Sequence, residues 1–272
     1  MRNAWLIMAH NEFEVLRLLL SKLDSPDSDF YLHFDRKVKA LPSLEPLQHG
    51  RLFVLGERID GRWGDISLVE IELLLMETAL KNGPYTHYHV LSGVHLPLWS
   101  KEELIRFYDS HPDETILRLW DRNDEEADFK MRRFHYPVRD FKSANRGRRK
   151  ACQLTWRASL RVQKTLGIRH LRNEVFYKAD QWLSLAEPAC RYLVDNKKSI
   201  LKKYKWSFCP DEFFAPTELM AHSETGACFH YPQLLYAEFG VDSPRTFPLE
   251  AYEELKKTGC LWARKFTGRK VQ

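Results

Sequence analysis

Apolar residues along the chain follow two spacings, one typical of strands and one typical of helices. Short apolar runs at residues 4–8 and 88–91 predict buried strands, whereas residues 12–23 and 67–80 carry apolar side chains at helical intervals. This alternation predicts an α/β sheet with helices on its faces. The other predicted strands are 30–34, 52–55, 115–119 and 174–177, and the other predicted helices are 101–110, 185–194 and 211–220.

Two local patterns refine this picture. Ser67 is followed three residues later by Glu70, which predicts a capping box at the start of the helix 67–80. Residues 121–169 are irregular, charged and aromatic, and they are interpreted as an insertion over the site that is helical from Gln153 onward. The sequence has no internal repeat and no clear linker, so one domain over residues 1–272 is expected.

Composition supports a large core and argues against a membrane span. Hydrophobic residues make up 44% of the 272 residues and aromatic residues 13%. No apolar run approaches the roughly 20 residues that cross a bilayer. The apolar segment 4–9 is too short for a secretory signal and is followed directly by polar residues. A cytoplasmic protein is therefore expected.

The cysteines and the charges give weaker indications. No CxxC pair occurs, so free thiols are expected rather than a zinc site or disulfides; the cysteines are Cys152, Cys190, Cys209, Cys228 and Cys260. The net charge is +5, and basic residues gather at 142–150, 197–205 and 264–270. Such patches suit a nucleotide sugar, an anionic glycolipid or membrane, or nucleic acid, although a solvated face is preferred for 197–205.

Polar residues at predicted strand ends point to a small-molecule site, because ligands of α/β sheets gather at the carboxyl ends of strands. These groups are His10-Asn11, 35–37, Ser92-Gly93 and 178–181. No dinucleotide fingerprint, P-loop, nucleophile elbow or HExxH zinc motif is present.

Two groups of residues have side chains that can bind a metal, but both are interpreted as structural. His87 and His89 flank Tyr88 on one strand face and are expected to be core or surface histidines. Asp27-Ser28-Asp29 matches a DxD pattern, but its turn-rich setting argues against a metal site.

The segment 206–217 carries the strongest chemical signal. Pro210, Asp211 and Glu212 stand directly before an aromatic run with helical character, and both proline and acids are favoured in a first helical turn. A carboxylate held there suits a general base acting on a sugar hydroxyl. The alternative is that the two acids only stabilise the helix terminus.

Five motifs occur in an order that resembles a known family. They are HFDRK at 33–37, WGDISLV at 63–69, LSGVHLPL at 91–98, PDEFF at 210–214 and LWARKF at 261–266. Together they resemble the core-2/I-branching β-1,6-N-acetylglucosaminyltransferase family, which also contains the peptide O-xylosyltransferases. Each motif alone is weak, whereas five in order over nearly the whole chain are specific.

The resemblance implies a GT-A-like, Rossmann-type fold and an inverting sugar transfer from a UDP-sugar without a divalent metal or other cofactor. It implies that Glu212 is the general base and that Lys265 stabilises the departing diphosphate, as a metal-free reaction needs cations there. Arg245 is the best match for a second diphosphate-binding cation, with Arg264 as an alternative. Asp35 matches the acid that recognises uracil.

The same resemblance distributes the other residues between donor and acceptor. His10 and Asn11 are expected to line the donor pocket with Trp63 and Gly64. Residues 1–120 then form the nucleotide-sugar-binding half and residues 121–272 the acceptor-binding and catalytic half. The acceptor side is expected to include Asp211.

Three features of the acceptor side depart from the family pattern or stay open. Ser92 and Gly93 stand where other GT-A enzymes hold metal-binding acids, and the family often has Asp in place of His95. Trp182 follows Ala-Asp where the family tends to have Gly-Ser, which puts the acceptor in doubt. Trp182 and Trp206 either stack on an acceptor sugar or are buried.

Three functions are weighed. An inverting glycosyltransferase is preferred, with UDP-GlcNAc favoured over UDP-xylose as donor. A non-catalytic nucleotide-sugar- or glycan-binding relative is second, and the presence of Glu212 and Lys265 argues against it. A nucleic-acid-binding protein ranks last, because no such module is present and the charge excess is small. A bacterial enzyme is expected, acting on a glycan or lipid-linked oligosaccharide, with peripheral contact to an anionic membrane.

Overall fold

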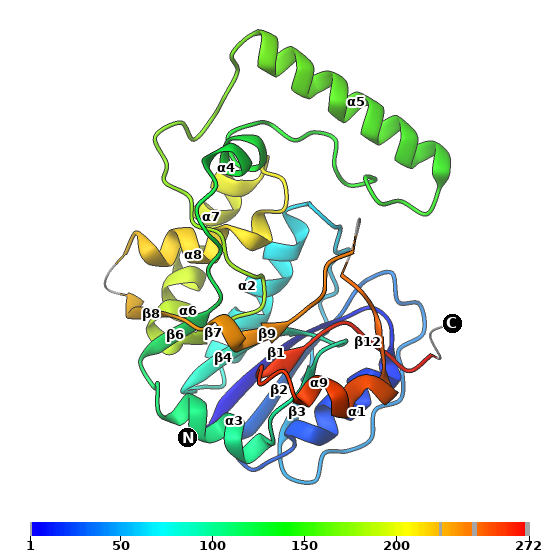
Figure 1. The fold of residues 1–272 in the computed structure, drawn as a ribbon, viewed down its shortest axis with the longest axis vertical. Helices are drawn as coiled ribbons and strands as arrows, with labels where there is room; N and C mark the ends of the chain where they lie inside the picture. Colours follow the sequence, from blue (N-terminus) through cyan, green and yellow to red (C-terminus); the bar gives the residue numbers. More distant parts are fainter. Residues whose placement is uncertain (1, 223–224, 241–243, 270–272) are drawn as a thin grey trace.

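A mixed sheet forms the centre of the molecule (Figure 1). The computed structural model describes residues 2–222, 225–240 and 244–269. Within these residues the sheet has seven strands in the order β3-β2-β1-β4-β7-β6-β8. Their bounds are β1 (Asn3–Ala9), β2 (Ser28–Phe34), β3 (Arg51–Val54), β4 (His87–Ser92), β6 (Glu114–Leu117), β7 (Ser184–Ala186) and β8 (Ala227–His230).

The directions of the strands set the position of a ligand site. Strand β1 pairs in parallel with β2 and β4, and β2 pairs in parallel with β3. The carboxyl ends of β1, β2 and β4 therefore lie together at one edge. Strand β7 runs antiparallel to both β4 and β6. This mixed α/β sheet flanked by helices confirms the fold class predicted from the sequence.

Helices and two small sheets cover the two faces of the main sheet. Helices α2 (Ser67–Leu80) and α6 (Glu187–Asp195) pack on one face. The other face carries α1 (Phe13–Leu23), α3 (Lys101–Asp109) and a small sheet of β5 (Leu96–Pro97), β11 (Trp262–Ala263) and β9 (Leu235–Tyr236). The second small sheet pairs β10 (Phe247–Pro248) with β12 (Phe266–Thr267). The segment after residue 260 reaches the first strand through the contact of Trp262 with Trp5.

The remaining helices are short, with one exception. Helix α5 (Arg146–Thr165) is long and stands away from the sheet, with α4 (Asp124–Lys130) between it and the body (Figure 1). The others are α7 (Lys197–Tyr204), α8 (Phe214–Met220), α9 (Tyr252–Lys256) and the 3-10 helices η1 (Pro210–Glu212), η3 (Pro232–Leu234) and η4 (Leu249–Ala251).

Aromatic residues and histidines fill the core beneath the small sheet. The ring of Trp5 stacks on that of His89 and meets Trp262 edge-on. His89 is buried and hydrogen-bonds to Ser184 and Asn3, and burial keeps its pKa well below the usual value. The interpretation of His89 as a core histidine is confirmed, because both ring nitrogens are used inside the protein.

Asp29 of the DxD pattern has a structural role as well. Its carboxylate is buried on β2 and is held by Arg2, Arg51 and the hydroxyl group of Tyr85. These partners lower the pKa of Asp29, although burial alone raises it. The carboxylate thus joins the ends of three neighbouring segments.

The predicted strand at residues 174–177 is wrong. The backbone of Tyr177 hydrogen-bonds to the side chain of Thr217 rather than to a neighbouring strand. The returning strand is β7, which occupies residues that the sequence predicted as the first turn of helix 185–194. That helix begins at Glu187 instead, with proline in its first turn.

The predicted helix 67–80 is confirmed with its bounds, but its predicted capping box and two other predicted helices differ from the structure. Ser67 forms no capping box: its hydroxyl group accepts from the Arg62 N–H inside the preceding turn, and the box is found at Ser100 and Glu103 on α3. Helix α5 begins seven residues before Gln153. The predicted helix 211–220 breaks at Phe213 into η1 and α8.

Candidate active site

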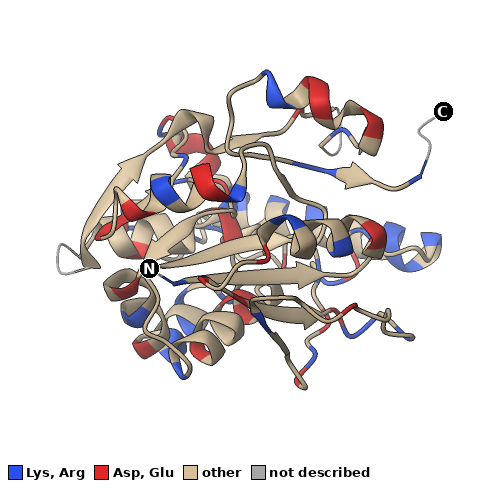
Figure 2. Cartoon of the chain, turned by 90° about the horizontal axis from the view of Figure 1, so that it is seen from below, with Lys and Arg blue, Asp and Glu red and all other residues tan. Residues whose placement is uncertain are grey.

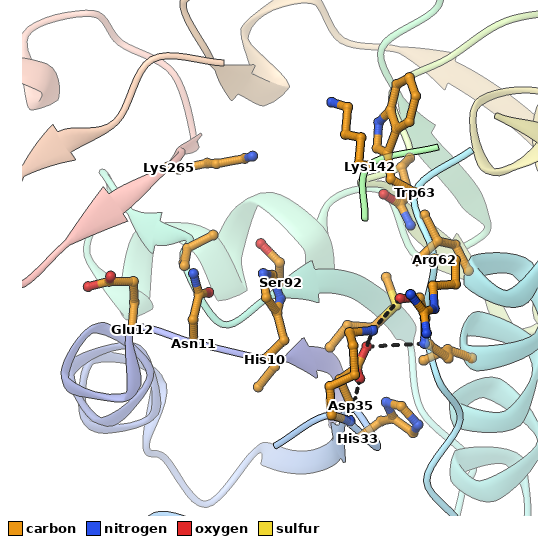
Figure 3. A pocket seen from close by; sticks show the side chains of 18 of the residues that line it. His10, Asn11, Glu12, His33, Asp35, Arg62, Trp63, Ser92, Lys142 and Lys265 are labelled. Atoms are coloured by element: carbon orange, nitrogen blue, oxygen red, sulfur yellow. Dashed lines mark hydrogen bonds and ion pairs between the residues drawn. The ribbon is translucent and has the colours of Figure 1, made fainter. Parts of the chain in front are cut away.

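A cavity of about 740 Å³ opens at the carboxyl ends of β1, β2 and β4 (Figure 3). Its floor is formed by residues at the ends of these strands: His10 and Asn11 follow β1, Asp35 follows β2, and Ser92 is the last residue of β4. Loops complete the walls at 61–63, 139–144 and 264–266. The cavity therefore takes residues from both sides of residue 120.

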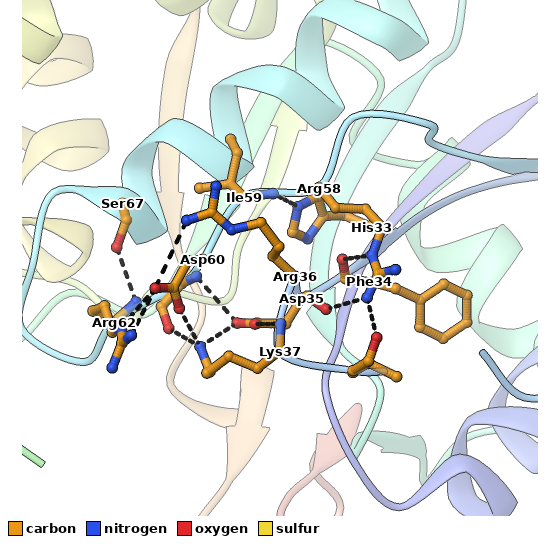
Figure 4. A network of polar contacts seen from close by, with 12 residues as sticks. His33, Phe34, Asp35, Arg36, Lys37, Arg58, Ile59, Asp60, Arg62 and Ser67 are labelled. Atoms are coloured by element: carbon orange, nitrogen blue, oxygen red, sulfur yellow. Dashed lines mark hydrogen bonds and ion pairs between the residues drawn. The ribbon is translucent and has the colours of Figure 1, made fainter. Parts of the chain in front are cut away.

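Asp35 anchors a network of acids and cations on one wall (Figure 4). Its carboxylate accepts hydrogen bonds from Lys37 Nζ at 2.8 Å and from the Gly61 N–H at 3.1 Å. Lys37 also contacts Asp60 at 2.9 Å, and Asp60 in turn binds Arg62 at 2.7 Å. These partners lower the pKa of Asp60 to about 2 against the opposing effect of burial. The loop 60–62 is thereby fixed against the end of β2.

His10 and Ser92 both line the cavity, one after the end of β1 and the other at the end of β4 (Figure 3). Burial lowers the pKa of His10; Asp35 opposes this effect, and the neighbouring Lys265 adds to it. The Ser92 hydroxyl group lies 2.8 Å from Nδ1 of His95, which is fully buried. The Ser92 side chain is thus held in place by His95, three residues further along the chain.

Lys265 is the exceptional cation of this site. Its side chain points into the cavity above Asn11 and His10 (Figure 3). No carboxylate of the described residues forms an ion pair with it. Burial, together with the positive charges of Arg264 and Lys142, lowers the pKa of Lys265 to about 8. An anionic ligand would relieve this repulsion, because it would supply the missing counter-charge.

Arg264 lies deeper than Lys265. Its guanidinium carbon is 4.5 Å from the centre of the Trp182 ring, an arrangement typical of a cation–π contact. Burial lowers the pKa of Arg264 to about 10, while Asp180 and Asp211 act in the opposite direction. Trp182 is only 8% exposed, yet its edge lines the cavity. This tryptophan therefore serves first as a platform for the arginine.

Trp63 and Lys142 face each other at the mouth of the cavity. Lys142 Nζ lies 3.8 Å from the centre of the Trp63 ring, which is 42% exposed. Phe208 meets the same ring edge-on from below. An exposed aromatic face beside a cation is suited to a nucleotide or a sugar ring.

Gly64 connects the cavity wall to the acidic segment. Its φ of +78° lies in the left-handed region, and a Cβ there would lie 2.8 Å from the Phe208 ring. Its carbonyl group accepts a hydrogen bond from the Cys209 N–H, at the start of η1. A glycine is therefore required for the close approach of these two loops.

The Glu212 carboxylate lies in a cluster with two lysines and a second acid. Lys130 Nζ is 2.8 Å from Glu212 Oε2, and Lys178 Nζ is 3.6 Å from the same atom. Both lysines also contact Glu126. The Glu212 side chain is 33% exposed, so a ligand can reach it. The cluster does not belong to the lining of the main cavity.

Asp211 is buried between this cluster and the cavity. Burial, together with the charge of Glu212, raises the pKa of Asp211 to about 7, and Lys130 and Arg264 oppose the rise. Of the predicted pair, Glu212 is thus the accessible carboxylate and Asp211 the buried one. The helix-terminus interpretation applies only in part, because η1 is a single turn and has no side-chain cap.

Most of the predicted site residues come together, and a few do not. The lining includes His10, Asn11, Asp35, Trp63, Ser92, Trp182, Arg264 and Lys265. Gly93 packs behind the floor against Ala9. Arg245 is exposed and forms an ion pair with Glu238 at 2.9 Å, and Trp206 packs on Tyr136 away from the cavity.

Several lining residues have no individual role predicted from the sequence, although Lys37 and Gln181 belong to the strand-end groups 35–37 and 178–181 that point to a site. Lys37 adjoins Asp35, and Lys142 belongs to the basic run at 142–150, so a signal was present for both. Gln181 donates a hydrogen bond to Glu72, which is buried on α2 and has a pKa raised well above the usual value by burial. For Glu72, the signal in the sequence was an acid within the apolar stripe of α2. For Gln181, it was the place of this residue in the strand-end group 178–181.

Comparison with known proteins identifies the family. A sequence model of the Core-2/I-Branching enzyme family matches residues 3–231. The chain belongs to this family. The Core-2/I-Branching match includes four of the five motifs, and the fifth, with Lys265, lies beyond it. No curated protein sequence matches the chain significantly.

A structural comparison gives a distant similarity. The apo crystal structure of mouse xyloside xylosyltransferase 1 aligns with a TM-score of 0.41 at 10% sequence identity, covering 100% of this chain and 99% of the other. The family itself is one of glycosyltransferases.

Over the described residues, no helix is long and apolar enough to cross a membrane, and no three acidic, histidine or cysteine side chains are grouped as metal ligands.

Proposed function

We propose that the protein is an inverting glycosyltransferase that moves a sugar from a UDP-sugar to a glycan hydroxyl group without a divalent metal. The observation that supports this most directly is Lys265, a cation that points into the cavity with no counter-charge among the described residues. A nucleoside diphosphate supplies such a charge, and the neighbouring Arg264 adds a second cation. Metal-free departure of UDP requires this kind of positive charge.

The proposed donor site follows from the arrangement of the walls. Asp35 would accept the ring N–H of uracil at the end of β2, with His10 and Asn11 beside it. The diphosphate would lie between Lys265 and Arg264. We assign the second cationic role to Arg264 in place of Arg245, because the Arg245 side chain is exposed and already paired with Glu238.

Glu212 is proposed as the general base. In the reaction, the acceptor oxygen attacks the anomeric carbon of the donor while the bond from that carbon to the diphosphate oxygen breaks. The hydroxyl proton passes to the Glu212 carboxylate, and the electron pair of the broken bond leaves with UDP. Lys130 and Lys178 hold the carboxylate in place through the contacts described above. Attack from the face opposite the leaving group inverts the anomeric centre.

GlcNAc is the proposed sugar, with xylose as the alternative, and the acceptor is proposed to be a glycan or a lipid-linked oligosaccharide. We further propose that the enzyme acts in the bacterial cytoplasm in contact with an anionic membrane. A non-catalytic relative that only binds nucleotide sugars would keep the same cavity. The presence of an accessible carboxylate beside two lysines favours the enzyme.

A panel of UDP-sugars assayed in excess EDTA with a mixture of glycan acceptors tests the proposal. Release of UDP from one donor should survive EDTA and fall about 100-fold or more in Glu212→Gln, since a general base contributes at least that much. Glu126→Gln is the matched control, because Glu126 contacts the same two lysines. Complete inhibition by EDTA would refute the metal-free mechanism. UDP binding without turnover for every donor and acceptor would favour the non-catalytic relative.

A further inference from the structure

Helix α5 carries more basic residues than any other helix of the described residues. Its 20 residues, Arg146–Thr165, contain seven Lys or Arg residues and no Asp or Glu. Helix α7 also carries only basic residues, its four lysines. Helices α1, α3, α4, α6 and α9 combine basic and acidic residues, and helices that carry both colours are visible in Figure 2. Because α7 shares charge of one sign, what distinguishes α5 is the length of its basic surface and the apolar side chains exposed beside it.

One side of α5 attaches it to the insertion. Trp156 donates a hydrogen bond from Nε1 to Nδ1 of His135 at 2.9 Å and packs on Phe208. Gln163 exchanges hydrogen bonds with the backbone of Phe134. Because these attachments recur at helical spacing, the opposite side of α5 is fixed in orientation and faces outward.

The outward side carries an apolar row. Leu154, Ala158, Val162 and Leu166 follow one another at intervals of four residues, so they lie along one side of the helix. Leu154 is 69% exposed, Val162 55% and Leu166 66%. Exposed leucines at this spacing are unusual on a free surface and typical of an amphipathic contact.

A basic row runs beside the apolar row. Lys150, Arg157, Arg161 and Lys164 are all exposed, and their spacing places them along one flank of the apolar side chains. At the end of the helix, Lys164 also lines a surface depression of about 580 Å³ that contains four arginines and a single acid. The other residues of this depression are Asp128, Arg132, Arg133, Gly167, Arg169 and Arg172.

We propose that the outward side of α5 docks on an anionic phospholipid bilayer, with the helix lying in the plane of the membrane surface. The apolar row would enter the boundary between headgroups and acyl chains, while the basic row would pair with lipid phosphates. The depression at the end of the helix would take a further headgroup phosphate. A nucleic acid would satisfy the basic row but leave the leucines exposed to water, which favours the bilayer.

Docking through α5 would place the candidate active site near the membrane. The loop 139–144 lines the cavity and leads within two residues into α5. The benefit of this placement rests on the proposed function, because only a glycosyltransferase would gain from having a lipid-linked acceptor near the mouth of its cavity. The docking itself is independent of catalysis.

Vesicle co-sedimentation without any nucleotide sugar tests the docking surface. The intact protein should bind vesicles of phosphatidylcholine with phosphatidylglycerol, fail to bind pure phosphatidylcholine, and dissociate as salt is raised. Arg157→Glu with Arg161→Glu should lower the partition coefficient at least ten-fold. Leu154→Ser with Val162→Ser should lower it at constant charge. The matched control is Lys198→Glu with Lys202→Glu on α7, which changes the net charge by the same amount.

The outcomes separate this proposal from the proposed function. Equal binding by the α5 charge variant and the intact protein would overturn the docking surface, as would an equal loss in the α7 control. Binding to duplex DNA but not to vesicles would assign the surface to a nucleic acid instead. Glu212→Gln should keep full vesicle binding, so a failure of catalysis leaves the docking result intact. Circular dichroism and UDP binding check that each variant is folded.

Discussion

Replacing Lys265 by alanine should weaken UDP binding while leaving uridine binding nearly unchanged. The structure supplies the magnitude. One pKa unit corresponds to about 1.4 kcal/mol, so the fall of the Lys265 pKa from its ordinary 10.5 to about 8 sets an upper limit of roughly 3 kcal/mol on what a counter-charge can restore. The side chain is partly exposed and solvent screens it, so we expect about half of this, or an affinity loss of roughly 10- to 20-fold.

The pH dependence of UDP affinity follows from the same pKa. Lys265 is protonated below about pH 8 and binds the diphosphate as a cation, so UDP affinity should fall as the pH rises through 8. Lys265→Arg should keep its charge and flatten this dependence. Isothermal titration calorimetry with UDP and uridine, at pH 6.5 and 9, measures both effects.

Two results would refute this reasoning. One is an alanine variant that binds UDP as well as the intact protein does. The other is an equal loss of affinity for UDP and for uridine, which would show that Lys265 shapes the pocket without meeting the diphosphate. Lys37→Ala is a useful contrast, since that lysine is paired with Asp35 and Asp60 and should affect uridine as much as UDP.

Three further predictions concern stability and recognition. The pKa of Asp211 is raised to about 7 in the folded protein, so its contribution to stability is complete below about pH 4 and is lost as the pH rises through about 7. Asparagine does not ionise and avoids this loss. Asp211→Asn should therefore stabilise the protein by roughly 1–3 kcal/mol more at pH 8 than at pH 5, as measured by urea denaturation. Gly64→Ala should lower the free energy of unfolding by about 1–2 kcal/mol, since its φ is +78° and the new Cβ meets Phe208; an unchanged urea midpoint would contradict this. Asp35→Asn should weaken uridine binding at least five-fold by calorimetry, and equal affinities would exclude the proposed contact with uracil.

The central strands could be predicted from the sequence because each contains a short, mainly apolar run and is buried on both faces. Strands β1, β2 and β4 are recognisable in this way, and their carboxyl ends then locate His10, Asp35 and Ser92. Strand β7 was missed because a three-residue strand has too little pattern to distinguish it from a helix start. Its pairing is decided by β4 and β6, which are distant in the chain.

The walls of the site could be predicted only in part. Lys265 was found through a motif, and the structure places it in the cavity. Arg245 is predicted by its distance from that motif, and its backbone does lie beside that of Lys265. Its side chain, however, is exposed and paired with Glu238, whereas Arg264 lines the cavity. Lys130 and Lys178 reach Glu212 from segments 82 and 34 residues away, which no local pattern reveals. Convergence of distant segments depends on packing rather than on local sequence.

Because residues 264–266 form one wall of the cavity, the cavity can be completed only late in the synthesis of the chain. Glu12, directly after β1, accepts hydrogen bonds from Thr267 and Gly268, which are synthesised about 255 residues later. The first strands can pair while the ribosome is still translating, but residues 264–266 are added only after all the strands of the main sheet, the last of them β8, have been made. Contacts across so long a stretch of chain form late. A nascent chain that has not passed residue 265 can therefore form the sheet but still lacks the cationic wall of the cavity.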